Sequence, residues 1–137
     1  MKNFILNYKD AEGNEKEVAM RLTSSSCEQI EKQYNCTLLN YVQQGSVTSL
    51  VTMLQYMREG AGERFTRAMA QSFYDELVDS GYTIEKILMD IIYEVLVVSG
   101  VISEEDLREI KDERERIKNM TDEEKKALVE ERKNAQK

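Results

Sequence analysis

The residues of this chain that could do chemistry are carboxylates, because the sequence contains no histidine. Asp75, Glu76 and Asp79 fall within one helical stretch, and Glu28 and Glu31 fall within another. Two carboxylates about one helical turn apart could serve glycosidase-like acid–base chemistry or bind a divalent metal ion. The polar face of an ordinary amphipathic helix looks the same, and we favour that interpretation. The sequence therefore predicts no catalytic residue.

Metal and cofactor sites are also absent from the sequence pattern. Cys27 and Cys36 are the two cysteines, and without histidine or a second cysteine pair they cannot complete a structural zinc site. We expect reduced, partly buried thiols, with a redox role as the alternative. Gly60-Ala61-Gly62 is too short to hold a phosphate group, and no nucleotide-binding or zinc-protease motif occurs. We expect no cofactor, no metal and no enzymatic activity.

Composition limits the possible partners. The chain has 137 residues, 41% of them hydrophobic, and a formal net charge of −7 without a basic cluster. These values suit one modest domain with an appendage, and they disfavour a nucleic-acid or membrane-surface partner. The first ten residues are too short and polar for a secretory signal. The most apolar run, residues 84–102, contains four charged residues and is a poor membrane span. We expect a cytoplasmic protein.

The N-terminal residues 1–23 alternate between apolar and polar side chains. Alternation places Phe4, Leu6 and Tyr8 on one face of a first run, and Val18, Met20 and Leu22 on one face of a second. The turn sequence DAEGN separates the two runs, so the pattern predicts a β-hairpin. We expect this hairpin to pack on the helices of its own chain. Extension of its free edge by a partner strand is the alternative.

Residues 24–102 carry the periodicity and start signals of helices. Ser25-Ser26-Cys27-Glu28 has the spacing of a capping box, and Ser46 and Thr83 precede two later apolar segments. Gly60-Ala61-Gly62 suits a sharp reversal between two helices. The segment from Thr83 has a single narrow polar stripe, so we expect it to form the centre of the core.

Residues 103–137 differ in composition from the rest. From residue 104 onward, 12 acidic and 10 basic side chains occupy 22 of the 34 positions. So few apolar residues remain that the segment cannot fold alone, and we expect a helical or partly disordered tail. The predicted fold is mostly α: a small helical domain with an N-terminal β-hairpin and a charged C-terminal helical extension.

Methionines and aromatic residues gather on both sides of the Gly60–Gly62 reversal. Flexible thioethers and aromatic rings suit a surface that must accept another protein's helix. The hypothetical binding surface consists of Met53, Tyr56, Met57, Phe65, Met69 and Phe73. The alternative is that the methionines fill gaps in an irregular core.

The order of these segments resembles a known family. The segments are LTSSSCEQIEKQYNCTLLNYV, VTSLVTMLQYMREG, FYDELVDSGYTIEKILMDIIYEVLVVSGVI and a highly charged end, and DELVDSGYTIEKI is the most characteristic phrase. Over residues 22–102 the chain is similar to the tail assembly chaperones of long-tailed phages and prophages of Gram-positive bacteria.

The resemblance implies a helical, non-enzymatic protein of the host bacterial cytoplasm that is not part of the mature virion. It implies binding to the tape measure protein, contact with the tail-tube protein and self-association. No catalytic or binding residue carries over from the family. A small acidic adaptor or regulator, such as an anti-repressor-like protein, is the alternative. Interleaved acidic and basic residues in the tail argue against the extended carboxylate pattern of a nucleic-acid mimic.

Overall fold

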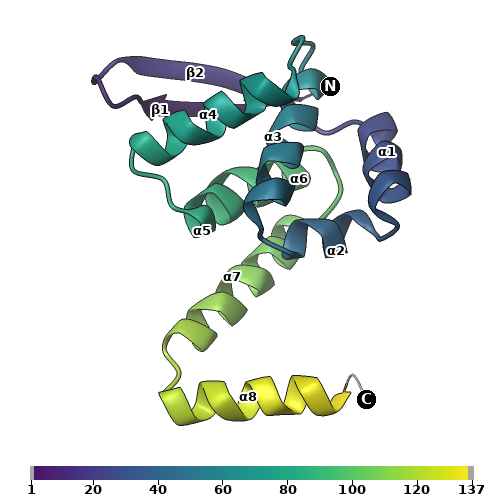
Figure 1. Ribbon diagram of the computed structural model, residues 1–137, viewed down its shortest axis with the longest axis vertical. Coiled ribbons are helices and arrows are strands. Elements are labelled where there is room, and N and C mark those ends of the chain that lie inside the picture. The colour runs from purple at the N-terminus through teal and green to yellow at the C-terminus, as the bar shows by residue number, and fades with distance from the viewer. Residues whose placement is uncertain (1, 136–137) are drawn as a thin grey trace. The chain divides into compact units, whose positions relative to one another are not determined.

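The computed structural model describes residues 2–135, and the chain divides into two compact units, residues 1–103 and 104–137. The first unit consists of β1 (Phe4–Lys9), β2 (Glu15–Met20), α1 (Ser24–Tyr34), α2 (Leu38–Gln43), α3 (Val47–Gly60), α4 (Arg67–Asp79), α5 (Ile84–Lys86), the π-helical stretch η1 (Ile87–Ile92) and α6 (Tyr93–Val98) (Figure 1). The second consists of α7 (Glu104–Lys118) and α8 (Asp122–Ala135). The prediction of a mostly helical fold with an N-terminal hairpin is confirmed.

The hairpin forms as the alternation predicts. β1 and β2 pair antiparallel from Phe4 opposite Met20 to Lys9 opposite Glu15. The Asp10 carboxylate closes the turn, because it accepts the backbone N–H groups of Glu12 at 3.0 Å and Asn14 at 2.8 Å. The alternating faces separate by burial: Leu6, Tyr8 and Met20 are buried, whereas Ile5 is 45% exposed.

The end of β2 is bound to the C-terminal end of α3. The Arg21 N–H donates to the Met57 carbonyl oxygen at 2.9 Å, and Arg58 Nη1 donates to the Ala19 carbonyl oxygen at 2.6 Å. The Leu22 N–H donates to Ser99 Oγ, just after α6, at 2.9 Å. The hairpin thus packs on helices of its own chain, and in Figure 1 it lies alongside α4.

The helices α1 to α5 begin at threonine or serine caps. The predicted caps Ser46 and Thr83 accept backbone N–H groups from Ser49 and Lys86, as expected. The predicted capping box at Ser25–Glu28 is wrong, because Thr23 is the cap of α1 and accepts from the Ser26 N–H at 3.2 Å. Thr23 keeps an extended backbone soon after β2, so the helix begins before the serine run ends.

The core lies around α3 and the helical segment from α5 to α6. Met53, Leu54 and Met57 on α3 are fully buried, and so are most apolar residues of η1 and α6. This agrees with the expectation that residues 84–98 form the centre of the core. Two details were not predicted: Ile84 is 43% exposed, and the helix widens to a π-helical turn over η1.

The second unit is described by itself as two charged helices. α7 carries an exposed ion pair between Arg116 and Glu113, with 2.6 Å between Nη2 and Oε1. Acidic residues occupy the first turn of each helix and basic residues the last, as the helix dipole favours. The predicted tail also includes residues 136–137, which lie outside the described residues. Within residues 2–135, no helix combines the length and apolar character that a membrane crossing requires.

Candidate protein-binding surface

The structure separates the six predicted binding residues into two groups. Met53 and Met57 are completely buried, so the prediction that they face a partner is wrong. The helix α3 packs against α4, η1, β2 and α2, so almost every side of it is covered. Tyr56 is half-buried and does not line the groove described below.

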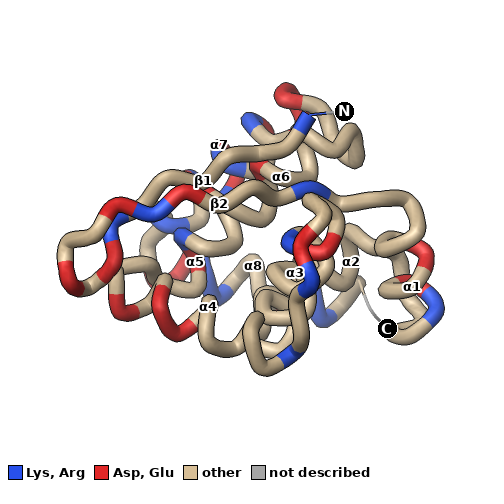
Figure 2. The backbone as a smooth tube through the Cα atoms, turned by 90° about the horizontal axis from the view of Figure 1, so that it is seen from above, with Lys and Arg blue, Asp and Glu red and all other residues tan. Residues whose placement is uncertain are grey.

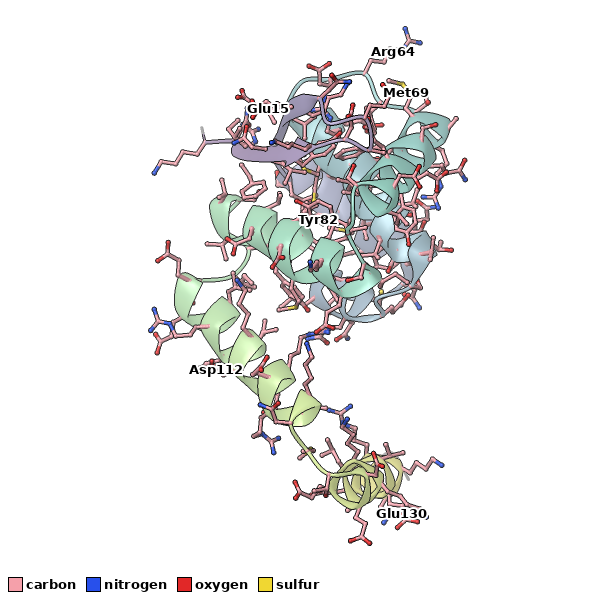
Figure 3. The ribbon with its side chains drawn as sticks, turned by 90° about the vertical axis from the view of Figure 1, so that its left-hand side faces the viewer. Glu15, Arg64, Met69, Tyr82, Asp112 and Glu130 are labelled. Atoms are coloured by element: carbon pink, nitrogen blue, oxygen red, sulfur yellow. The ribbon has the colours of Figure 1, made fainter. Side chains whose placement is uncertain are left out.

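The other three predicted residues lie together in an open groove between the hairpin and α4. Phe65, Met69 and Phe73 line it, and it encloses about 680 Å³. Phe65 and Phe73 meet edge to face, with ring centroids 6.2 Å apart. Met69 is 45% exposed, and Figure 3 shows its side chain at the surface. This arrangement leaves an apolar surface that a partner's side chain can reach.

Residues of the hairpin and α3 complete the groove. Val18 and Tyr8 line it from the hairpin, and the Tyr8 and Phe73 ring centroids are 6.3 Å apart. The Arg58 guanidinium carbon is 5.4 Å from the centroid of the Phe65 ring, a cation–π contact. The alternation of the hairpin already placed Tyr8 and Val18 on its inner face. It did not show that this face meets α4.

The connection between α3 and α4 is held in place by two side chains. Arg67 Nη1 donates to Thr52 Oγ1 at 2.6 Å, and Gln55 Nε2 donates to the Phe65 carbonyl oxygen at 3.4 Å. The first contact joins the start of α4 to α3, and the second joins the connecting segment to α3. Phe65 is therefore fixed at the groove although it lies outside both helices.

Beyond the apolar groove, a second depression carries acidic residues. Its lining includes five carboxylates: Asp10, Glu12, Asp75, Glu76 and Asp79. The two depressions share three lining residues, Lys16, Ser72 and Glu76, so they form one continuous surface. Figure 2 shows acidic residues at the β1–β2 turn and along neighbouring segments.

The carboxylates considered for chemistry have identifiable structural settings. Glu76 Oε2 accepts the Tyr8 hydroxyl at 2.7 Å, whereas Asp75 and Asp79 are exposed. Glu31 Oε2 accepts the Leu38 N–H at 3.0 Å, so it joins α2 to the end of α1. Among the described residues, no three histidine, cysteine or acidic side chains are arranged to hold a metal ion.

The two cysteines are partly buried and neither forms a disulfide. Burial raises the pKa of the Cys27 thiol, and the nearby Glu31 carboxylate adds to this effect. A raised pKa keeps the thiol protonated near neutral pH and lowers its reactivity. These observations favour the structural interpretation of Cys27 over the redox alternative.

Tyr8 makes the stability of the fold depend on pH in the alkaline range. Burial, followed by the hydrogen bond to Glu76, raises the pKa of Tyr8 far above its ordinary value of about 10. Above pH 10 the unfolded chain loses this proton while the folded chain keeps it. Stability that is present below pH 10 is therefore lost as the pH rises toward the folded-state pKa.

We expect Tyr8→Phe to lower the free energy of unfolding at pH 7 by about 1 kcal/mol, because it removes a hydrogen bond to a carboxylate. The deficit should shrink at pH 11, where wild type alone is weakened by Tyr8 ionisation in the unfolded chain. Urea unfolding of wild type and Tyr8→Phe at pH 7 and at pH 11 measures this deficit. Tyr74→Phe is the control, because within residues 2–135 its hydroxyl makes no hydrogen bond. A deficit that grows with pH would contradict the expected behaviour.

No family model, curated protein or solved structure matches this chain.

Proposed function

We propose that this protein is a non-enzymatic phage tail assembly chaperone that binds the tape measure protein and keeps it soluble. In this proposal it also contacts the tail-tube protein and promotes tail-tube assembly in the host cytoplasm. The resemblance over residues 22–102 supports this choice of family. The groove between the hairpin and α4 supplies a place for an apolar segment of the client.

The observation that carries the proposal is the apolar groove itself. Met69 is 45% exposed beside Phe65 and Phe73. The chain has a formal net charge of −7, which helps to keep a complex in solution. A tape measure protein is a long helical chain that would expose apolar faces before the tube forms around it. A groove lined by methionine and aromatic rings can accept such faces without a fixed sequence.

A matched pair of substitutions on α4 tests this proposal. Met69 and Val78 are exposed to almost the same extent, 45% and 43%, but only Met69 lines the groove. We expect Met69→Gln to lower capture of the co-expressed tape measure protein about fivefold, as loss of roughly 1 kcal/mol of apolar contact predicts. Val78→Gln should leave capture unchanged.

The measurement is the amount of soluble tape measure protein recovered with the tagged chaperone after the two proteins are co-expressed. Circular dichroism of each variant establishes that both remain folded. The proposal fails if wild type does not increase the soluble client. The groove assignment fails if Met69→Gln and Val78→Gln have equal effects.

A further inference from the structure

Among residues 2–135, the acidic depression contains both carboxylates that have a partner and carboxylates that have none. Glu76 accepts a hydrogen bond from the Tyr8 hydroxyl. Asp10 accepts hydrogen bonds within the β1–β2 turn, and its Oδ2 lies 3.9 Å from Lys16 Nζ. Within residues 2–135, the side chains of Glu12, Asp75 and Asp79 have no hydrogen bond or ion pair. Among the described residues, Lys16 is the one cation in the lining of this depression. The surface beside the apolar groove is therefore strongly negative.

These carboxylates suit long basic side chains better than a compact ion. No three acidic side chains among the described residues converge as metal ligands would. Lysine and arginine have flexible apolar stems, so they can reach separate carboxylates while the stem covers apolar surface. Charge complementarity of this kind selects partners and fixes how they lie in a groove.

We propose that the groove binds a segment of another protein in which one or two large apolar residues are followed by lysines or arginines. The apolar residues occupy the Phe65–Met69–Phe73 part, and the basic residues meet Asp75, Asp79 and Glu12. This inference rests on the proposed function, since it makes the segment part of the tape measure protein.

The positions along α4 set the spacing of such a segment. The middle of Met69 and Phe73 is separated from the middle of Asp75 and Asp79 by about six residues, or about 9 Å along a helix. A partner helix that lies along α4 would place its basic residues about two turns from its apolar anchor. That spacing can be built into a peptide.

The helices of this chain's own tail fit the groove poorly. Glu104–Lys118 carries seven acidic and five basic residues, and Asp122–Ala135 carries five acidic and four basic residues. Each helix is net negative and would be repelled by the carboxylates of a second copy. The complementary occupant is therefore a different, basic chain.

A peptide titration against the full-length protein tests the charge preference. The probe is an alanine-based helical 18-mer with phenylalanine and leucine four residues apart and three lysines two turns beyond. Its control has glutamine in place of each lysine. By calorimetry in 50 mM NaCl, we expect the lysine peptide to bind about tenfold more tightly, with the difference reduced in 300 mM NaCl by screening.

Paired substitutions locate the charge effect. Asp75→Asn with Asp79→Asn should weaken binding of the lysine peptide about fivefold, as two partly exposed charge contacts predict. Glu28→Gln with Glu63→Gln removes the same charge from exposed positions outside the groove. That control should change affinity less than twofold.

Three results would overturn the inference. Equal weakening by both pairs would mean attraction to the overall negative charge. Equal binding of both peptides would mean a purely apolar groove. Concentration-dependent dimers in sedimentation that disappear in Met69→Gln would make a second copy the occupant.

Capture of the tape measure protein distinguishes failure of this inference from failure of the proposed function. Capture of the client by wild type that is undiminished in Asp75→Asn with Asp79→Asn supports the function and refutes the charge preference. If wild type fails to capture the client, the proposed function fails. The peptide titration would then still decide whether the groove selects basic segments.

Discussion

Gly60→Ala is expected to destabilise the protein by about 3 kcal/mol, although alanine is the better helix former by about 1 kcal/mol. Gly60 is the last residue of α3, and a methyl group there would overlap the carbonyl oxygen of Arg21. The neighbouring carbonyl carbon would be only 2.9 Å away. Both atoms belong to the backbone, so no side-chain rotation can relieve the overlap.

Relief would require α3 and the end of β2 to move apart. That movement would strain the hydrogen bond from Arg21 to Met57 and the one from Arg58 to Ala19, each worth about 1 kcal/mol or more. The expected loss is a substantial fraction of the 5–15 kcal/mol typical of a domain. It should appear as a melting temperature lower by about 10–20 °C.

Thermal and urea unfolding followed by circular dichroism would measure this loss. Thr48→Ala is the control, because Thr48 is an exposed residue of the same helix and Ala is the better helix former there too. Gly60→Ala as stable as Thr48→Ala would show that the close approach of the two backbones has no energetic role.

The periodic elements could be predicted from the sequence because they depend on local rules. Alternation in residues 4–8 and 16–22 fixes which side chains of the hairpin are buried. Hydroxyl caps at Ser46 and Thr83 fix where helices begin. Gly60 shows the limit of this reasoning. The Gly60-Ala61-Gly62 pattern suggests a flexible reversal, yet Gly60 is helical and provides clearance for a chain segment 39 residues earlier.

The binding surface was only half predictable for a related reason. A stripe of apolar residues shows which face of a helix avoids water, but not which neighbours already cover that face. Met53 and Met69 look alike in sequence, yet one is fully buried and the other is 45% exposed. The difference comes from long-range packing: neighbouring elements cover α3 on almost every side, whereas Met69 lies on the side of α4 that lines the open groove.

Arg58 connects the hairpin to the Phe65 side of the groove. We therefore expect its replacement to have the second-largest effect on the free energy of unfolding. Its guanidinium donates to the Ala19 carbonyl oxygen at 2.6 Å and lies over the Phe65 ring. Ala19 lies at the end of β2, where that carbonyl has Arg58 as its side-chain donor. One side chain on α3 therefore fixes both the hairpin and the aromatic wall of the groove.

We expect Arg58→Ala to lower the free energy of unfolding by about 2 kcal/mol, because it removes a charge-assisted hydrogen bond and a cation–π contact. Water partly replaces these interactions in the variant. Arg58→Lys should recover only part of this, because an ammonium group cannot donate to Ala19 and cover Phe65 in the same planar geometry. Urea unfolding of both variants would measure these differences.

Arg64→Ala is the matched control for Arg58→Ala. It removes the same charge six residues away from an exposed side chain that, within residues 2–135, makes no hydrogen bond or ion pair. Its stability should stay within about 0.5 kcal/mol of wild type. Equal stability of Arg58→Ala and Arg64→Ala would mean that the hairpin stays in place without the arginine. In that case the groove would be shaped by apolar packing of Tyr8, Val18 and Phe73 alone.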